Sequence, residues 1–199
     1  MSRLPALKRS TLPYTALFCE ENIWQLARIL VESGFPSDRL WVLFFSNAAR
    51  QVALRRQRAG GEGGLVVWDY HVVLQARDDE RDLIYDFDTT LPFPSDTRRY
   101  VAETFPDSVS ISPALRGRVR RIPAAVYLHR FHSDRSHMAG MIPEERFPKW
   151  PAITPEHPEV IALRRYWDME RELDDGSGIL PIEAIPIREA EIDQGEWSP

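Results

Sequence analysis

The chain has 199 residues, which is enough for one domain with its own hydrophobic core. Its 43% hydrophobic and 28% charged residues are typical of a soluble globular protein, and a net charge of −5 without a strongly basic face argues against nucleic-acid binding. The longest apolar runs are too short to span a membrane, and no apolar stretch follows the basic N-terminal residues, so we expect no membrane association, no signal peptide and a cytoplasmic location.

The first half of the chain predicts one helix followed by strands. In 20–33, apolar residues recur at helical spacing and Gly34 stands where a helix C-terminal cap belongs. The apolar run 40–45 predicts a buried strand, 47–58 a short helix, and the glycine-rich segment 60–64 a flexible loop. Two strands are expected at 65–76 and 83–88, joined by a polar turn at 77–82.

The second half is less regular. A third strand is expected at 119–127, and the arginines at 116, 118, 120 and 121 fit a solvated strand edge better than a phosphate patch. Five prolines in 143–158 exclude regular structure there, and 159–173 is expected to be helical. The acidic tail beyond it is expected to be an extended arm or partly disordered. We therefore predict an α+β domain with a mixed or antiparallel sheet flanked by helices, with a core at 1–142 and a C-terminal extension at 143–199 that packs on it or trails from it.

Cys19 is the one cysteine, so the chain forms no internal disulfide and no multi-cysteine zinc site. It stands at the start of the predicted helix, where the helix dipole lowers a thiol pKa and backbone N–H groups can hold an oxyanion. This position fits a nucleophile, although a cysteine packed under the helix start fits it as well.

His71 lies on the second predicted strand, and Asp86 and Asp88 lie on the third. The turn allows two registers, in which paired residue numbers sum to about 157 or about 159. Either register places both aspartates on the face of His71, one opposite it and one diagonal to it. A histidine beside a strand aspartate is the base and orienting group of a catalytic triad. The alternative is that these polar side chains face water on a half-exposed sheet.

A metal site is not predicted. His129, His132 and His137 are closely spaced, but they lack the helical pairing with carboxylates that metal-binding helices show.

Four segments resemble the protein N-terminal glutamine amidohydrolase family: FCEENIW at 18–24, VWDYHVVL at 67–74, IYDFDT with LPFP at 84–94, and SDRSHM at 133–138. The resemblance runs in order from about Tyr14 to Met138, and the proline-rich and acidic stretches beyond that residue do not resemble the family. It implies a triad of Cys19, His71 and Asp86, and it is the resemblance that selects Asp86 over Asp88.

The resemblance also implies a fold similar to that of transglutaminases and papain-like enzymes. The implied reaction converts an N-terminal glutamine of a protein or peptide to glutamate and releases ammonia, through a thioester and without a metal or organic cofactor. In eukaryotes this reaction feeds the N-degron pathway. We expect a monomer whose partners are its Gln-initiated substrates.

Two other functions stay open at this stage: related cysteine-triad chemistry, on internal glutamines or in transglutamination, and a degenerate binding module. An enzyme limited to chain termini needs a carboxylate for the substrate ammonium. Glu20, Glu21, Asp69 and Asp88 are the candidates, and the sequence does not rank them.

Overall fold

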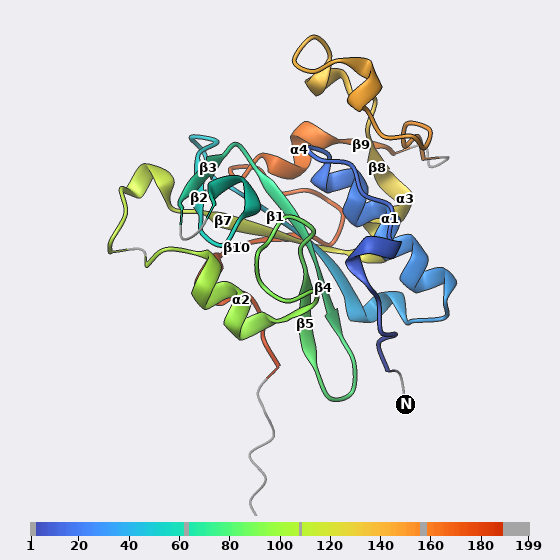
Figure 1. Cartoon of the computed structure of the whole chain (residues 1–199), viewed down its shortest axis with the longest axis horizontal. Coiled ribbons are helices and arrows are strands. Elements are labelled where there is room, and N and C mark those ends of the chain that lie inside the picture. The colour runs from blue at the N-terminus through green and yellow to red at the C-terminus, as the bar shows by residue number, and fades with distance from the viewer. Residues whose placement is uncertain (1–2, 62–63, 108, 156–158, 189–199) are drawn as a thin grey trace, which may run out of the picture.

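The computed structural model describes residues 3–61, 64–107, 109–155 and 159–188 and centres on a six-stranded antiparallel sheet (Figure 1). The strand order is β10-β7-β1-β4-β5-β6. The bounds are β1 Leu40–Ser46, β4 His71–Arg77, β5 Asp82–Tyr85, β6 Ser95–Asp96, β7 Arg118–Pro123 and β10 Gly178–Pro181. This architecture confirms the predicted α+β class.

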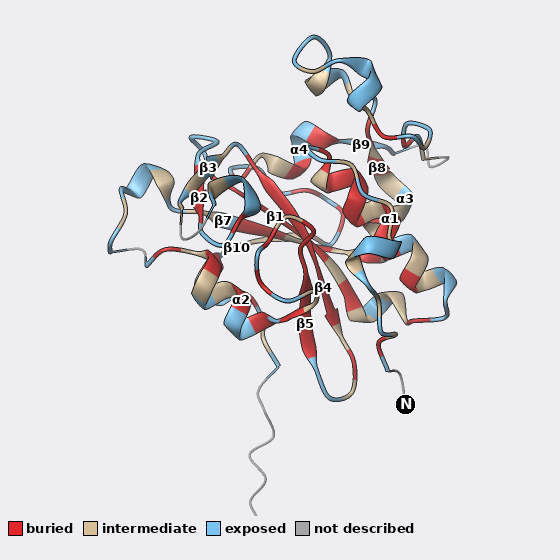
Figure 2. Cartoon of the chain, in the orientation of Figure 1, coloured by how far each residue is buried: buried red, intermediate tan, exposed pale blue. Residues whose placement is uncertain are grey.

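Both faces of the sheet are covered, which gives the domain two hydrophobic cores (Figure 2). On one face lie α1 (Cys19–Glu32), α3 (Ala124–Arg130) and α4 (Leu163–Trp167). On the other lie α2 (Thr97–Thr104) and a small sheet of β2 (Val52–Leu54) and β3 (Val66–Trp68). In β1, Phe44 enters the first core and Phe45 the second. A strand buried on both sides explains the uninterrupted apolar run at 41–45.

Helix α1 confirms the predicted helix to within one residue at each end. Its apolar stripe of Ile23, Leu26, Ala27 and Leu30 is fully buried against the sheet. Gly34 has a φ of +89°, and its N–H donates to the Val31 carbonyl at 2.9 Å. This left-handed conformation favours glycine and ends the helix as expected.

The predicted hairpin is present as β4 and β5, although the expected strand 65–76 is divided, with 66–68 forming β3 of the small sheet and only β4 joining the hairpin. Arg77 pairs with Asp82 and Leu74 with Tyr85, which is the second of the two expected registers. Both strands are buried along almost their whole length, so the alternative of a half-exposed, water-facing sheet is wrong.

Three predicted elements are wrong. Residues 47–58 form a turn and β2 rather than a helix, and the expected strand 119–127 ends at Pro123, after which α3 begins. The expected helix 159–173 contains only the short strand β9 (Ile161–Ala162) and α4. The sequence analysis also missed α2.

Arg120 accounts for the short length of α4, and its burial also contradicts one of the sequence predictions. Its side chain is fully buried and donates to the carbonyls of Tyr166, Asp168 and Arg171, and to the hydroxyl of Ser177. The carbonyl groups of these three residues accept from the Arg120 guanidinium rather than from N–H groups of a continuing helix. The chain after α4 therefore bends around the Arg120 side chain. The expectation of a solvated strand edge is therefore wrong for Arg120.

The described part of the C-terminal extension packs on the rest of the domain. Strand β9 pairs with β8 (Phe131–His132), and β10 forms an edge of the main sheet beside β7. Residues 189–199, where the tail was expected to be extended or disordered, lie outside the described residues. Within the described ranges, no helix has the length and apolar character needed to cross a membrane.

Candidate active site

Cys19 is the first residue of α1 and is half-buried. The turn before it is fixed by the buried Asn22, whose side chain bonds both the N–H and the carbonyl of Thr15 at 2.8 Å. The Cys19 thiol donates to the Oε2 atom of Glu20 at 3.6 Å, and the backbone N–H of Val72 acts on the sulfur by lowering its pKa. Because Val72 follows His71 directly, the helix start and the first residue of β4 meet at this point.

His71 and Asp86 form a buried pair. The His71 Nε2 and the Asp86 Oδ2 lie 3.1 Å apart, and each residue is 1% exposed. Burial alone would lower the pKa of His71, but the charge of Asp86 and its hydrogen bond raise that pKa above the ordinary 6.5. Burial alone would raise the pKa of Asp86, but His71 and the other donors keep it below its usual 3.8. The pair is therefore an ion pair when His71 carries two protons, and Asp86 fixes the ring by its Nε2 atom.

Three further donors hold Asp86 in place. Its Oδ2 accepts from the Tyr100 hydroxyl at 2.8 Å and from the Gln57 side-chain amide at 3.2 Å, and its Oδ1 accepts from the Asp88 N–H at 2.8 Å. Gln57 and Tyr100 were missed by the sequence analysis because they reach the site from elements far apart in the chain. Their burial beside a carboxylate is visible only in three dimensions.

The protonation of Cys19 differs from the expectation. The helix-start argument predicts a lowered thiol pKa, but burial raises it well above the ordinary value, followed by the charges of Glu20 and Asp88. The Val72 N–H acts in the other direction and lowers this pKa, but by less than burial and the two charges raise it. Cys19 is thus a thiol at neutral pH and needs a base to become a nucleophile.

The two glutamates after Cys19 explain the polar segment at 133–138. Glu21 is fully buried and accepts hydrogen bonds from Arg135 (2.8 and 2.9 Å), Ser133 (2.8 Å) and Trp150 (2.7 Å). Glu20, also fully buried, accepts from Tyr70 at 3.0 Å and lies 3.5 Å from His137 Nε2. The segment therefore closes over the beginning of α1.

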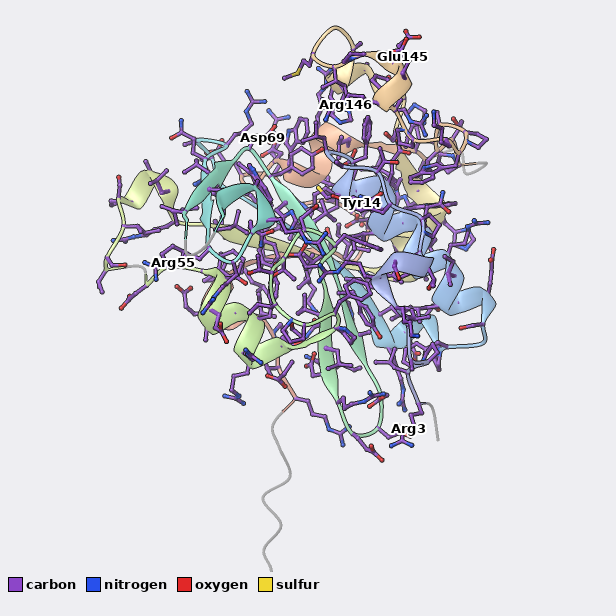
Figure 3. All side chains as sticks on the ribbon, in the orientation of Figure 1. Arg3, Tyr14, Arg55, Asp69, Glu145 and Arg146 are labelled. Carbon is purple, nitrogen blue, oxygen red and sulfur yellow. The ribbon has the colours of Figure 1, made fainter. Side chains whose placement is uncertain are left out.

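Asp88 and Tyr14 complete the surroundings of Cys19, His71 and Asp86. The Tyr14 hydroxyl donates to Asp88 Oδ1 at 2.6 Å, and its ring stacks on Phe87. Burial raises the pKa of Asp88 above its usual value despite the nearby His71. Figure 3 labels Tyr14 near α1, and Asp69 near the short connection between β3 and β4.

His71, Asp86 and Asp88 also bring one ligand atom each to within 4.8 Å of one another, a spacing that can hold a metal ion. However, the two Asp86 oxygens already accept hydrogen bonds from Tyr100, Gln57 and the Asp88 backbone, and Oδ2 also lies 3.1 Å from His71 Nε2. This arrangement suits an orienting carboxylate better than a metal ligand. Within the described parts of the chain, His129, His132 and His137 belong to no such group.

The chain matches a known family over most of its length. A sequence profile of the N-terminal glutamine amidase family matches residues 14–184. The match therefore continues past Met138, where the resemblance could not be followed, and includes α4 and β10.

Individual relatives support the same assignment. A protein N-terminal glutamine amidohydrolase of Drosophila mojavensis is 43% identical over 129 residues, covering 63% of this chain and 62% of the relative. The protein of the same name from Bos taurus is 39% identical over 132 residues, covering 65% and 64%. The aligned region thus spans a little under two thirds of the length of these relatives. From the profile match and these identities, the chain belongs to the N-terminal glutamine amidase family.

Proposed function

We propose that the protein hydrolyses the side-chain amide of an N-terminal glutamine to glutamate and releases ammonia, with Cys19 as nucleophile, His71 as base and Asp86 as the group that orients His71. The observation that supports this proposal is that α1, which begins at Cys19, packs on β4, which begins at His71, and that His71 Nε2 lies 3.1 Å from the buried Asp86 Oδ2. The relatives, which are named protein N-terminal glutamine amidohydrolases, support the substrate.

The proposed mechanism begins with proton transfer. Asp86 engages Nε2 of His71, which leaves the Nδ1 atom of the ring to take the proton of the Cys19 thiol. The sulfur then attacks the side-chain amide carbon of glutamine, and the carbonyl becomes a tetrahedral oxyanion. The N–H groups of the first turn of α1 have no partner within the helix, so they can stabilise this oxyanion.

The second half of the mechanism reuses the same histidine. His71 returns its proton to the amide nitrogen, the C–N bond breaks, and ammonia leaves a thioester on Cys19. Water gives a proton to His71 as it attacks the thioester carbon. The C–S bond then breaks, glutamate is released, and the proton returns to the sulfur. No further group is needed to balance these steps.

The test is ammonia release from peptides that differ only at the first residue, starting with Gln, Asn or acetylated Gln. We expect turnover of the Gln peptide alone, and none with Cys19→Ala at an unchanged melting temperature. Comparable rates on acetylated Gln would indicate deamidation of internal glutamines, and incorporation of an added amine would indicate transglutamination. Binding without turnover would favour a binding module and refute the proposal. A monomeric state and a cytoplasmic location stay predictions.

A further inference from the structure

The geometry of an N-terminal glutamine restricts where its ammonium can bind. Four single bonds of about 1.5 Å separate the side-chain amide carbon from the α-nitrogen, so the two atoms are at most about 5 Å apart. The peptide chain leaves from the same α-carbon and must reach solvent. The carboxylate that binds the ammonium therefore lies close to Cys19 and still retains accessible surface.

Two of the four candidate carboxylates fail on this requirement. Glu21 has no accessible surface and is already saturated by Arg135, Ser133 and Trp150. Glu20 lies next to the sulfur, with 3.6 Å between its Oε2 and the Cys19 Sγ, but it too is 0% exposed. A buried side chain cannot contact an ammonium whose main chain runs to solvent.

Asp69 fails for a different reason. It is exposed, and its Oδ1 accepts from the N–H of Tyr70, the next residue in the loop before β4 (Figure 3). Among the described residues, no hydrogen bond or ion pair joins Asp69 to Cys19 or His71, and it does not belong to the group of ligand atoms around His71.

Asp88 meets both requirements. It is half-buried, one of its carboxylate oxygens lies within 4.8 Å of a His71 nitrogen, and its charge acts on Cys19. Tyr14 occupies its Oδ1, and no lysine or arginine of the described residues forms a salt bridge with it. The charge of Arg58 also lowers the pKa of Asp88, but by less than His71 and the hydrogen bond from Tyr14 do. A partly desolvated carboxylate without a cationic partner is unfavourable until a cation binds.

We propose that Asp88 binds the α-ammonium group of the substrate, with Tyr14 as the positioning residue that holds its Oδ1 and leaves Oδ2 for the ammonium. This inference rests on the proposed function and adds the residue that restricts it to chain termini. The two aspartates of the segment 86–88 then have separate tasks: Asp86 orients the base, and Asp88 recognises the free amino group.

The decisive experiment compares Asp88→Asn with the unmodified protein on Gln and acetyl-Gln peptides. In the variant, KM for the Gln peptide should rise about 10- to 100-fold, the amount expected for a lost charged hydrogen bond. The preference for the free amine over the acetylated peptide should shrink by a similar factor, a change that mere loosening of the fold would not produce. Tyr14→Phe should raise KM less and keep most of the preference. Asp69→Asn is the matched control and should change neither quantity.

Each outcome separates the two proposals. If the unmodified protein does not release ammonia from the Gln peptide, the proposed function fails and the inference fails with it. If the unmodified protein is active and Asp88→Asn keeps both KM and the preference, the inference fails alone. A loss of kcat with unchanged KM and preference would also overturn it, because Asp88 would then act on the triad rather than on the substrate. Rates are compared over a range of pH, since the charge of Asp88 also raises the pKa of His71.

Discussion

Replacing Asp86 by asparagine tests the orienting role most directly, because the change keeps the size of the side chain and removes only its charge and one acceptor. Two orientations of the new amide are possible. With its NH₂ at the Oδ1 position, it faces the Asp88 backbone N–H, a donor that cannot turn away. With its NH₂ at the Oδ2 position, it faces Tyr100, Gln57 and His71 Nε2.

The second orientation is the easier one to accommodate. The Tyr100 hydroxyl can rotate, and the side-chain amide of Gln57 can flip, because its buried Oε1 has no hydrogen-bond partner among the described residues. His71 then accepts at Nε2 and carries its proton on Nδ1, so it can no longer take the proton of Cys19. A serine triad with this change loses about 10⁴ in kcat. We expect a similar loss here, with only about 1–3 kcal/mol of destabilisation from the rearranged bonds.

The measurement is kcat for the Gln peptide together with the pH dependence of kcat/KM. In the unmodified protein the acid limb, where His71 loses its proton, should lie above the ordinary histidine pKa of 6.5 because Asp86 raises it. In Asp86→Asn any residual activity should persist to lower pH, because burial then lowers the pKa without opposition. Tyr100→Phe is the matched control, since it removes one donor but keeps the charge, and should lose less than about tenfold. Activity of Asp86→Asn within tenfold of the unmodified protein would refute the reasoning.

Three further predictions follow from buried groups. Cys19 should react slowly with iodoacetamide at neutral pH and faster as pH rises, because its thiol pKa is raised; rapid labelling at neutral pH would contradict this. Glu21→Ala leaves Arg135 without its partner and should lower the free energy of unfolding in urea by about 3–5 kcal/mol, with faster tryptic cleavage in 133–150. An unchanged urea midpoint would show that the ion pair does not stabilise the fold. Arg120→Met removes the donor of three backbone carbonyls and should lower the free energy of unfolding by about 1 kcal/mol for each lost hydrogen bond, as measured by thermal unfolding. The matched change Arg118→Met, at an exposed side chain, should have a smaller effect.

Local patterns were sufficient where an element is determined by its own residues. Helix α1 carries an apolar stripe and a terminal glycine, and β1 is an apolar run, so both were predicted almost to the residue. The segment 119–127 was predicted as one strand because apolar residues recur throughout it. In the structure, β7 ends at Pro123 and α3 begins at the next residue. The segment 159–173 failed because its conformation is set by Arg120, which lies on another strand. Such long-range contacts leave no signal in the local sequence.

The same limit applies to the site. Strand pairing predicted that both aspartates share the face of His71, but it could not choose between them. In the observed register, β5 ends at Tyr85, and the chain leaves the ladder before Asp86. Asp86 is therefore free to turn inward to His71. If the β4–β5 ladder continued in the same register, Asp88 rather than Asp86 would lie opposite His71. The family resemblance selected the aspartate that contacts His71, while its catalytic role stays a prediction.

Burial, followed by the charges of Glu20 and Asp88, raises the pKa of the Cys19 thiol, whereas the helix dipole alone predicted a lowered pKa. The two glutamates that follow Cys19 differ in this respect. Glu21 is fully used in fastening the segment 133–150 over the start of α1, so its charge is neutralised by Arg135. Glu20 has no arginine or lysine partner in the described part of the chain, and its charge raises the pKa of the neighbouring sulfur. In the proposed mechanism the proton stays on Cys19 until His71 removes it, and this transfer requires Asp86 to hold the other nitrogen of the His71 ring. With a raised thiol pKa, the proposed reaction depends on the base and on its orientation, not on a preformed thiolate.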